Sequence, residues 1–172
     1  MNTSANFVST YFTEEKIESL FFIIIGIITI SLAIIFWFII KYSFYNGLAF
    51  PLLIVGLIQL IVGTTVYIRS PKDIIKVEQM MKQEPHKIKT EELPRMEMVM
   101  KNFTIYKWIE IALIVLGIIL FALFYKSPQT FWKGIGLGLI IQAALMLTLD
   151  FVAEKRGQTY IQALTDISVS LS

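Results

Sequence analysis

The sequence predicts an all-α integral membrane protein with four transmembrane helices, arranged as two helical hairpins that a long, partly helical cytoplasmic loop joins. Two observations lead to this fold class. Hydrophobic residues make up 56% of the 172-residue chain and charged residues only 16%, which is too apolar for an ordinary soluble domain. Charged residues are also absent from two long stretches, residues 19–40 and 42–68. Since ~20 apolar residues cross the hydrocarbon core as a helix, each stretch is long enough to span it.

Four apolar segments in total are predicted to span the membrane. The third and fourth reach spanning length only if Glu110 and Asp150 enter the membrane edge. A buried helix of a soluble protein would explain one such segment, but four in one short chain leave too few polar residues to cover them. The first segment is too long, and the residues before it too acidic, for a cleaved signal peptide. The predicted spans cover roughly residues 20–40, 48–68, 108–125 and 131–153.

Lys and Arg are distributed unequally between the two ends of these spans. Twelve of the fifteen lie on the side of the two termini and of the segment between the second and third spans. By the positive-inside rule this side is cytoplasmic, which places the protein in a cytoplasmic (inner) membrane. We therefore predict a single membrane domain over residues 1–172, with a cytoplasmic helical loop at 70–107 and a cytoplasmic tail at 154–172. Aromatic residues flank the spans, as amphipathic rings do at membrane interfaces.

The second part of the predicted loop carries apolar residues at helical spacing. The order i, i+3, i+4, i+7 joins Met96, Val99, Met100 and Phe103. No breaker follows, so we expect the third helix to begin near residue 93 and to protrude into the cytoplasm. This apolar face could pack on another helix beneath the bundle or bind lipid, a second copy or another protein. We name these four residues the possible partner surface. The mixed charges of the loop argue against nucleic acid.

Two carboxyl groups are expected inside the membrane. Glu110 and Asp150 fall at matching depth in the half of their spans nearer the cytoplasm. Carboxylates there are costly unless they are paired, hydrated or protonated, and they often mark ion or proton pathways. If the two lie together they would share a proton. The interpretation that we favour is instead that both reach the interface and pair with a basic residue, namely Lys107, Arg69, Lys155 or Arg156.

Amides and glycines are the remaining polar and small residues of interest in the spans. Gln59 and Gln142 fall near the midpoints of the second and fourth spans, and a hydrogen bond between them would clasp these helices together. A ligand site is the alternative. Small residues permit close helix approach, so the fourth span is expected to be central and the first peripheral. The candidate helix-packing glycines are Gly134 and Gly138, which form a GxxxG spacing, Gly117 and Gly56.

Catalytic and metal-binding motifs are missing from the chain. It has no Cys and a single His, His86, and it lacks phosphate-binding glycine loops. We therefore expect no enzyme, no metal and no cofactor. The leading hypothesis is a membrane protein that acts by protein binding or assembly, as an accessory subunit or an immunity-type protein. Its partners would be the bilayer and another protein or a second copy. The alternative is an oligomeric small transporter or channel that uses Glu110 and Asp150, with Gln59 and Gln142 along the path.

Overall fold

The protein is described by a computed structural model, with backbone placed for residues 2–170 and side chains for residues 6–169. Every element in this part of the chain is helical, which confirms the predicted all-α class. Residues 171 and 172 of the predicted tail lie outside the described residues. The elements are α1 (Asn2–Ile35), the π-helical η1 (Phe36–Ile40), α2 (Ser43–Gln83), the π-helical η2 (Ile88–Glu92), α3 (Leu93–Leu123) and α4 (Thr130–Ser170).

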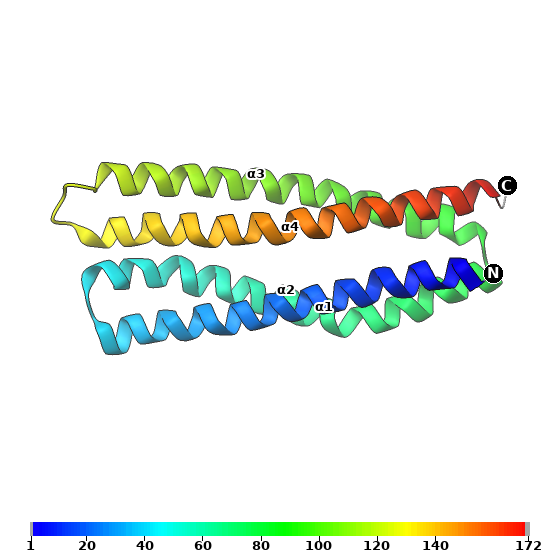
Figure 1. The fold of residues 1–172 in the computed structure, drawn as a ribbon, viewed down its shortest axis with the longest axis horizontal. Coiled ribbons are helices and arrows are strands. Elements are labelled where there is room, and N and C mark those ends of the chain that lie inside the picture. The colour runs from blue at the N-terminus through cyan, green and yellow to red at the C-terminus, as the bar shows by residue number, and fades with distance from the viewer. Residues whose placement is uncertain (1, 171–172) are drawn as a thin grey trace.

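Four helices are long and apolar enough to cross a membrane, as the sequence predicted. The 41 residues of α2 or α4 extend for about 60 Å at ~1.5 Å per residue, twice the ~30 Å of a hydrocarbon core. Each helix therefore has an apolar half and a half that carries most of its charges. The apolar half of the molecule ends in the connections at 41–42 and 124–129, and the polar half contains both termini (Figure 1).

The helices of the apolar half lie side by side in the order α1, α2, α4, α3 (Figure 1). α2 contacts α1 and α4, and α4 contacts α2 and α3. Within residues 2–170 the backbones of α1 and α3 do not approach each other, and the two helices meet through side chains in the polar half, where Tyr11 bonds to Met96. The fourth helix is therefore central and the first peripheral, as predicted. α2 shares the central position and α3 is also peripheral, which the sequence analysis did not foresee.

Two glycines bring the central helices into backbone contact. A methyl group on Gly134 of α4 would overlap the carbonyl oxygen of Phe44 in α2, and a methyl group on Gly47 of α2 would overlap the carbonyl oxygen of Phe131 in α4. The two contacts are reciprocal, so neither helix can accept a side chain at this point without moving its neighbour. The GxxxG spacing thus packs two helices of the same chain.

The other predicted packing glycines also lie at contacts between helices of this chain. A Cβ atom on Gly117 would lie 2.7 Å from a backbone oxygen, and one on Gly138 would lie 2.9 Å from a proline ring carbon. Both distances are shorter than a carbon atom tolerates. The facing residues are Gly26 of α1 for Gly56, Gly136 of α4 for Gly117, and Pro51 of α2 for Gly138.

Local signals account for the helix ends. Lys41 takes the left-handed conformation at φ 53° and donates its N–H to Phe36 O at 3.0 Å, which closes η1 and reverses the chain. α3 begins at Leu93, as predicted, and η2 extends the helix back to Ile88. The predicted loop at 70–107 is almost entirely helical, since α2 continues to Gln83 and only the residues around Pro85 break the path.

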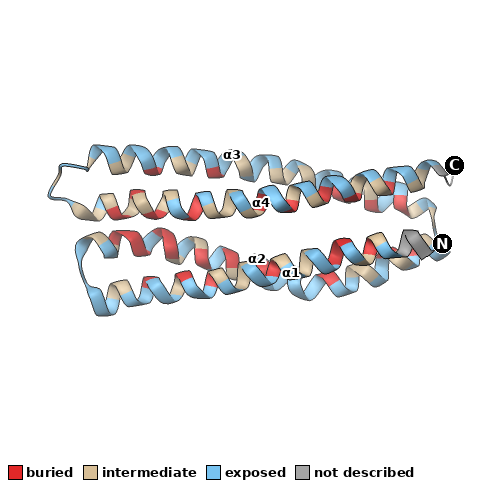
Figure 2. Ribbon diagram, in the orientation of Figure 1, coloured by how far each residue is buried: buried red, intermediate tan, exposed pale blue. Residues whose placement is uncertain are grey.

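Buried residues gather in the polar half, where α1 crosses towards α4, and along the facing sides of α2 and α4 (Figure 2). The outer sides of α1 and α3 in the apolar half expose large aliphatic side chains, the distribution expected of helices solvated by lipid. The polar half instead has the apolar core of a water-soluble helix bundle. We call it the polar-half core, and its buried members are Val8, Tyr11, Phe12, Val77, Met80, Ile88, Met96, Tyr160 and Leu164.

Candidate functional site

A cleft of about 550 Å³ lies between the α1–α2 pair and the α3–α4 pair. Residues of all four helices line it, and most of them are apolar. The backbones of α1 and α3 stay apart, so these two helices form the sides of the cleft and α2 and α4 form its base. Among the polar residues that line it are Glu110 of α3 and Gln142 and Asp150 of α4, which the sequence analysis had singled out. We call this cavity the intramembrane cleft.

Glu110 and Asp150 form a carboxyl pair in the wall of the cleft. Their exposed fractions are only 6% and 9%, and the two side chains lie close enough to interact. A carboxylate can only accept hydrogen bonds, so a bond between two carboxyl groups requires that they share a proton. Glu110 Oε2 is buried and has no hydrogen-bond partner. The geometry therefore brings together the two acids that the sequence analysis considered as a possible proton or ion site.

The basic residues that were expected to neutralise these acids are engaged elsewhere. The three ion pairs are Lys107 with Glu154 at 2.7 Å, Arg69 with Glu15 at 3.1 Å, and Arg156 with Glu18. The fourth candidate, Lys155, lines a separate groove. The interface pairing that we favoured from the sequence is therefore not formed. The pairing is absent because other carboxylates lie nearer the polar half. The basic side chains can pair with those carboxylates without entering the apolar region.

The two amides do not bond to each other. Gln59 is fully buried and donates from Nε2 to Met146 Sδ at 3.3 Å, so a polar contact does join α2 to α4. Gln142 is 1% exposed, and neither its oxygen nor its nitrogen has a partner. An amide left unbonded in a buried place is costly. Gln142 also lines the intramembrane cleft, with both amide atoms buried in its wall.

The possible partner surface on α3 faces inward in this structure. Met96 is completely buried in the polar-half core, and Val99 packs against the same core. Met100 lies against Gly157 of α4, and Phe103 lines the intramembrane cleft. The face therefore packs on a neighbouring helix, which was the alternative interpretation of this pattern. Helical spacing alone cannot distinguish an internal face from a docking face, because both repeat with the same period.

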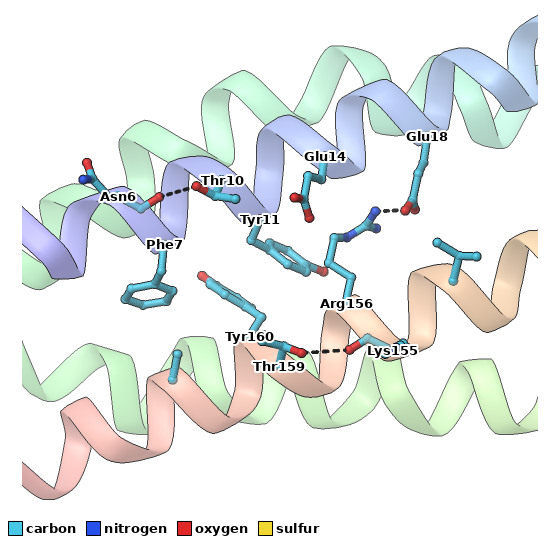
Figure 3. Close-up of a pocket in the computed structure, with 12 residues that line it drawn as sticks. Asn6, Phe7, Thr10, Tyr11, Glu14, Glu18, Lys155, Arg156, Thr159 and Tyr160 are labelled. Carbon is cyan, nitrogen blue, oxygen red and sulfur yellow. Dashed lines mark hydrogen bonds and ion pairs between the residues drawn. The ribbon is translucent and has the colours of Figure 1, made fainter.

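A second cavity of about 600 Å³ lies between α1 and α4 in the polar half (Figure 3). Tyr11 stacks on Tyr160 with ring centroids 4.0 Å apart, and the guanidinium of Arg156 lies 5.2 Å from the centroid of Tyr11. Arg156 reaches across to Glu18. Burial raises the pKa of the Tyr11 hydroxyl to about 12 and raises the pKa of Tyr160 as well, so both hydroxyls stay protonated near neutral pH. We call this cavity the α1–α4 groove.

A buried polar network ties the polar-half core together, and sequence reasoning missed it. Glu92 is 2% exposed and accepts hydrogen bonds from Arg95 at 2.6 and 2.8 Å and from the Tyr160 hydroxyl at 3.1 Å. Tyr11 donates to Met96 Sδ at 3.8 Å. The spacing of Glu92 and Arg95, three residues apart, signals an ion pair on one helix face. Nothing in the sequence indicates that α4 would cover it.

Within the described residues, no cluster of three or more His, Asp or Glu side chains could hold a metal ion. Comparison with protein-family models, with curated proteins and with solved structures finds no significant match to this chain.

Proposed function

We propose that this chain is a multi-pass protein of the cytoplasmic membrane that binds a cation or a proton at the Glu110–Asp150 pair and moves it across the bilayer as a small carrier or channel. The proposal is carried by one observation: two buried carboxyl groups on neighbouring helices interact in the lining of a cleft, and neither forms an ion pair with a described residue. Such a pair is costly to keep in an apolar region, and in membrane proteins that cost usually accompanies ion or proton pathways.

The orientation of the helices in the membrane is part of the same proposal. Two hairpins, α1–α2 and α3–α4, would cross the membrane with both termini and the break near Pro85 in the cytoplasm, because the basic residues concentrate in the polar half. In that orientation the carboxyl pair lies inside the membrane, towards its cytoplasmic face. The polar-half core then lies in water, where its hydrophobic residues gain from mutual burial.

Proton flux into liposomes tests this function. We expect the wild-type protein to carry protons down an imposed potential, and we expect Glu110→Gln combined with Asp150→Asn to abolish that flux. The matched control is Glu97→Gln with Asp166→Asn, since both residues are exposed and lie on α3 and α4 in the polar half. Helical content and elution volume should be the same for all three proteins. Equal flux from the wild-type and the cleft variant would reject the carboxyl mechanism.

A second candidate is assembly, in which the chain acts as an accessory subunit or immunity-type protein. The open side of the intramembrane cleft favours it, because α1 and α3 leave a gap that a second copy or a partner helix could close. The chain has no Cys, so single cysteines can be placed at will. Cysteines at Ile58 and Ile109, on the two sides of the cleft, should cross-link to a stoichiometric companion in native membranes. If neither single-cysteine variant forms a cross-link and both remain monomeric, this second candidate is rejected.

A further inference from the structure

The intramembrane cleft is open at its side. In the membrane orientation proposed above, that side faces lipid. Residues on its two sides are half exposed: Ile58 of α2 by 49%, and Tyr106 and Ile109 of α3 by 49% and 51%. Ile58 and Ile109 fall within the predicted spans, and Tyr106 lies just before the third span. A molecule dissolved in the membrane can therefore reach the carboxyl pair without first crossing the polar-half core.

The lining of the cleft suits a bulky apolar molecule. Its volume of about 550 Å³ falls within the ~300–1,000 Å³ of sites that bind drug-sized molecules. Aromatic, aliphatic and thioether side chains from every helix contribute, which gives large contact area to a ligand that presents hydrocarbon groups. These side chains include Phe22 of α1, Val62 of α2, Phe103 and Leu113 of α3, and Leu139 and Met146 of α4.

The charge of the cleft selects a cation. The Glu110–Asp150 pair retains one negative charge after sharing one proton. The other charged groups that face this region are already paired with one another: Glu15 and Glu18 of α1 with Arg69 of α2 and Arg156 of α4, and Lys107 of α3 with Glu154 of α4. An inorganic ion such as Ca²⁺ needs six or more oxygen ligands, and the cleft wall offers too few. An organic cation needs only the charge and the apolar lining.

We propose that the intramembrane cleft binds a hydrophobic organic cation, which enters between α1 and α3 from the membrane and displaces the proton shared by Glu110 and Asp150. This inference rests on the proposed function and names its substrate class. The exchange balances: one monovalent cation enters and one proton leaves, so the charge of the site is unchanged. Glu110 and Gln142 both line the cleft, and the Oε2 of Glu110 and the amide of Gln142 are buried polar atoms without a hydrogen-bond partner among the described residues.

Tetraphenylphosphonium tests the proposal because it is permanently charged, apolar and unable to donate a hydrogen bond. We would titrate it into the purified full chain in an uncharged detergent and weak buffer, recording heat and released protons together. We expect saturable binding with about one proton released per ligand, and on the order of tenfold or more weaker binding by Glu110→Gln with Asp150→Asn, a loss of at least ~1.4 kcal/mol. The control variant is again Glu97→Gln with Asp166→Asn.

Three further ligands separate the outcomes. Triphenylphosphine oxide is an uncharged compound with three phenyl groups on phosphorus in place of four. Equal binding of this compound would overturn the inference, since the cleft would then be a groove for neutral molecules or lipid. Proton release by tetramethylammonium or Na⁺ but not by tetraphenylphosphonium would overturn the substrate class while leaving cation binding at the pair intact. If no cation releases a proton and the liposome flux is also absent, both the inference and the proposed function fail.

Discussion

Arg156 of α4 forms an ion pair with Glu18 of α1, and the same two side chains line both the intramembrane cleft and the α1–α4 groove. The pair therefore borders both cavities. Figure 3 shows it at the α1–α4 groove. Burial raises the pKa of Glu18, and the adjacent arginine partly opposes that effect.

Breaking this ion pair should connect the two cavities. Because the chain has no Cys, Leu113→Cys places one thiol in the wall of the cleft. We expect Arg156→Gln to increase severalfold the rate at which a water-soluble maleimide modifies that thiol, since the shorter neutral side chain no longer spans to Glu18. Lys155→Gln is the control, because Lys155 lines only the groove. An unchanged rate in the Arg156 variant would show that the pair does not separate the cavities.

Gly134→Ala should destabilise the contact between α2 and α4. The new methyl group would overlap the backbone carbonyl of Phe44, which cannot rotate away. We expect a net loss of about 1–3 kcal/mol in unfolding free energy, larger than the ~1 kcal/mol that alanine gains in a helix. Gly157→Ala is the matched control on the same helix, because its nearest atom is the flexible Met100 Sδ at 2.8 Å. Thermal unfolding in detergent measures both variants. Equal melting temperatures for Gly134→Ala and Gly157→Ala would contradict the packing argument.

Glu92→Gln should destabilise the polar-half core. The substitution keeps the shape but removes the charge that accepts from Arg95 and Tyr160. We expect a cost of about 1–3 kcal/mol, the range for losing a charged partner in a buried hydrogen-bond network. Glu78→Gln serves as control, since its ion pair with Lys82 at 3.7 Å is exposed and should be worth no more than about 0.5 kcal/mol. Urea unfolding followed by circular dichroism measures both.

Alkaline pH should destabilise the protein through its stacked tyrosines. In the unfolded chain Tyr11 ionises near pH 10, whereas burial holds its pKa at about 12 in the folded state. Between these two values the unfolded state releases a proton that the folded state keeps, so stability is full below about pH 10 and falls by roughly 2–3 kcal/mol as the pH rises to about 12. The pKa of Tyr160 is also raised, and it acts in the same direction.

Tyr11→Phe should make the melting temperature less sensitive to pH over that window. The control is Tyr125→Phe, because Tyr125 is 64% exposed in the connection before α4. Thermal unfolding at about pH 9 and about pH 11 gives the comparison. A pH response of Tyr11→Phe identical to that of the wild type would show that ionisation of other groups, such as lysines, governs alkaline unfolding.

The membrane character and the helical class could be predicted from the sequence because both depend on local composition. Uncharged stretches such as 42–68 exceed the bilayer thickness whatever the tertiary contacts. Pro85 follows the end of α2, although the same helix contains Pro51 and Pro71. The glycines were also informative, since Gly134 and Gly117 lie at helix contacts as expected. These features need no knowledge of which helix lies beside which.

The contacts that individual side chains make with other helices could not be predicted. They depend on the order in which the helices lie side by side, which is α1, α2, α4, α3. From the sequence, Glu110 and Asp150 could each have paired with a nearby basic residue. In the structure those cations pair with other carboxylates, namely Glu15, Glu18 and Glu154. Met96 likewise has the spacing of a docking residue, yet it is buried because α1 crosses to meet α4 above it. Sequence periodicity identifies the apolar face but not its neighbour.

α2 and α4 continue without interruption from the reciprocal glycine contact to the polar-half core. A helix of about 60 Å behaves as a stiff lever, so a small tilt at the cleft becomes a larger displacement at the far end. The core around Tyr160 would then have to repack whenever the walls of the cleft spread. A movement of the cleft walls would therefore be transmitted to the polar-half core, and shortening the C-terminal end of α4 should alter the geometry of the cleft.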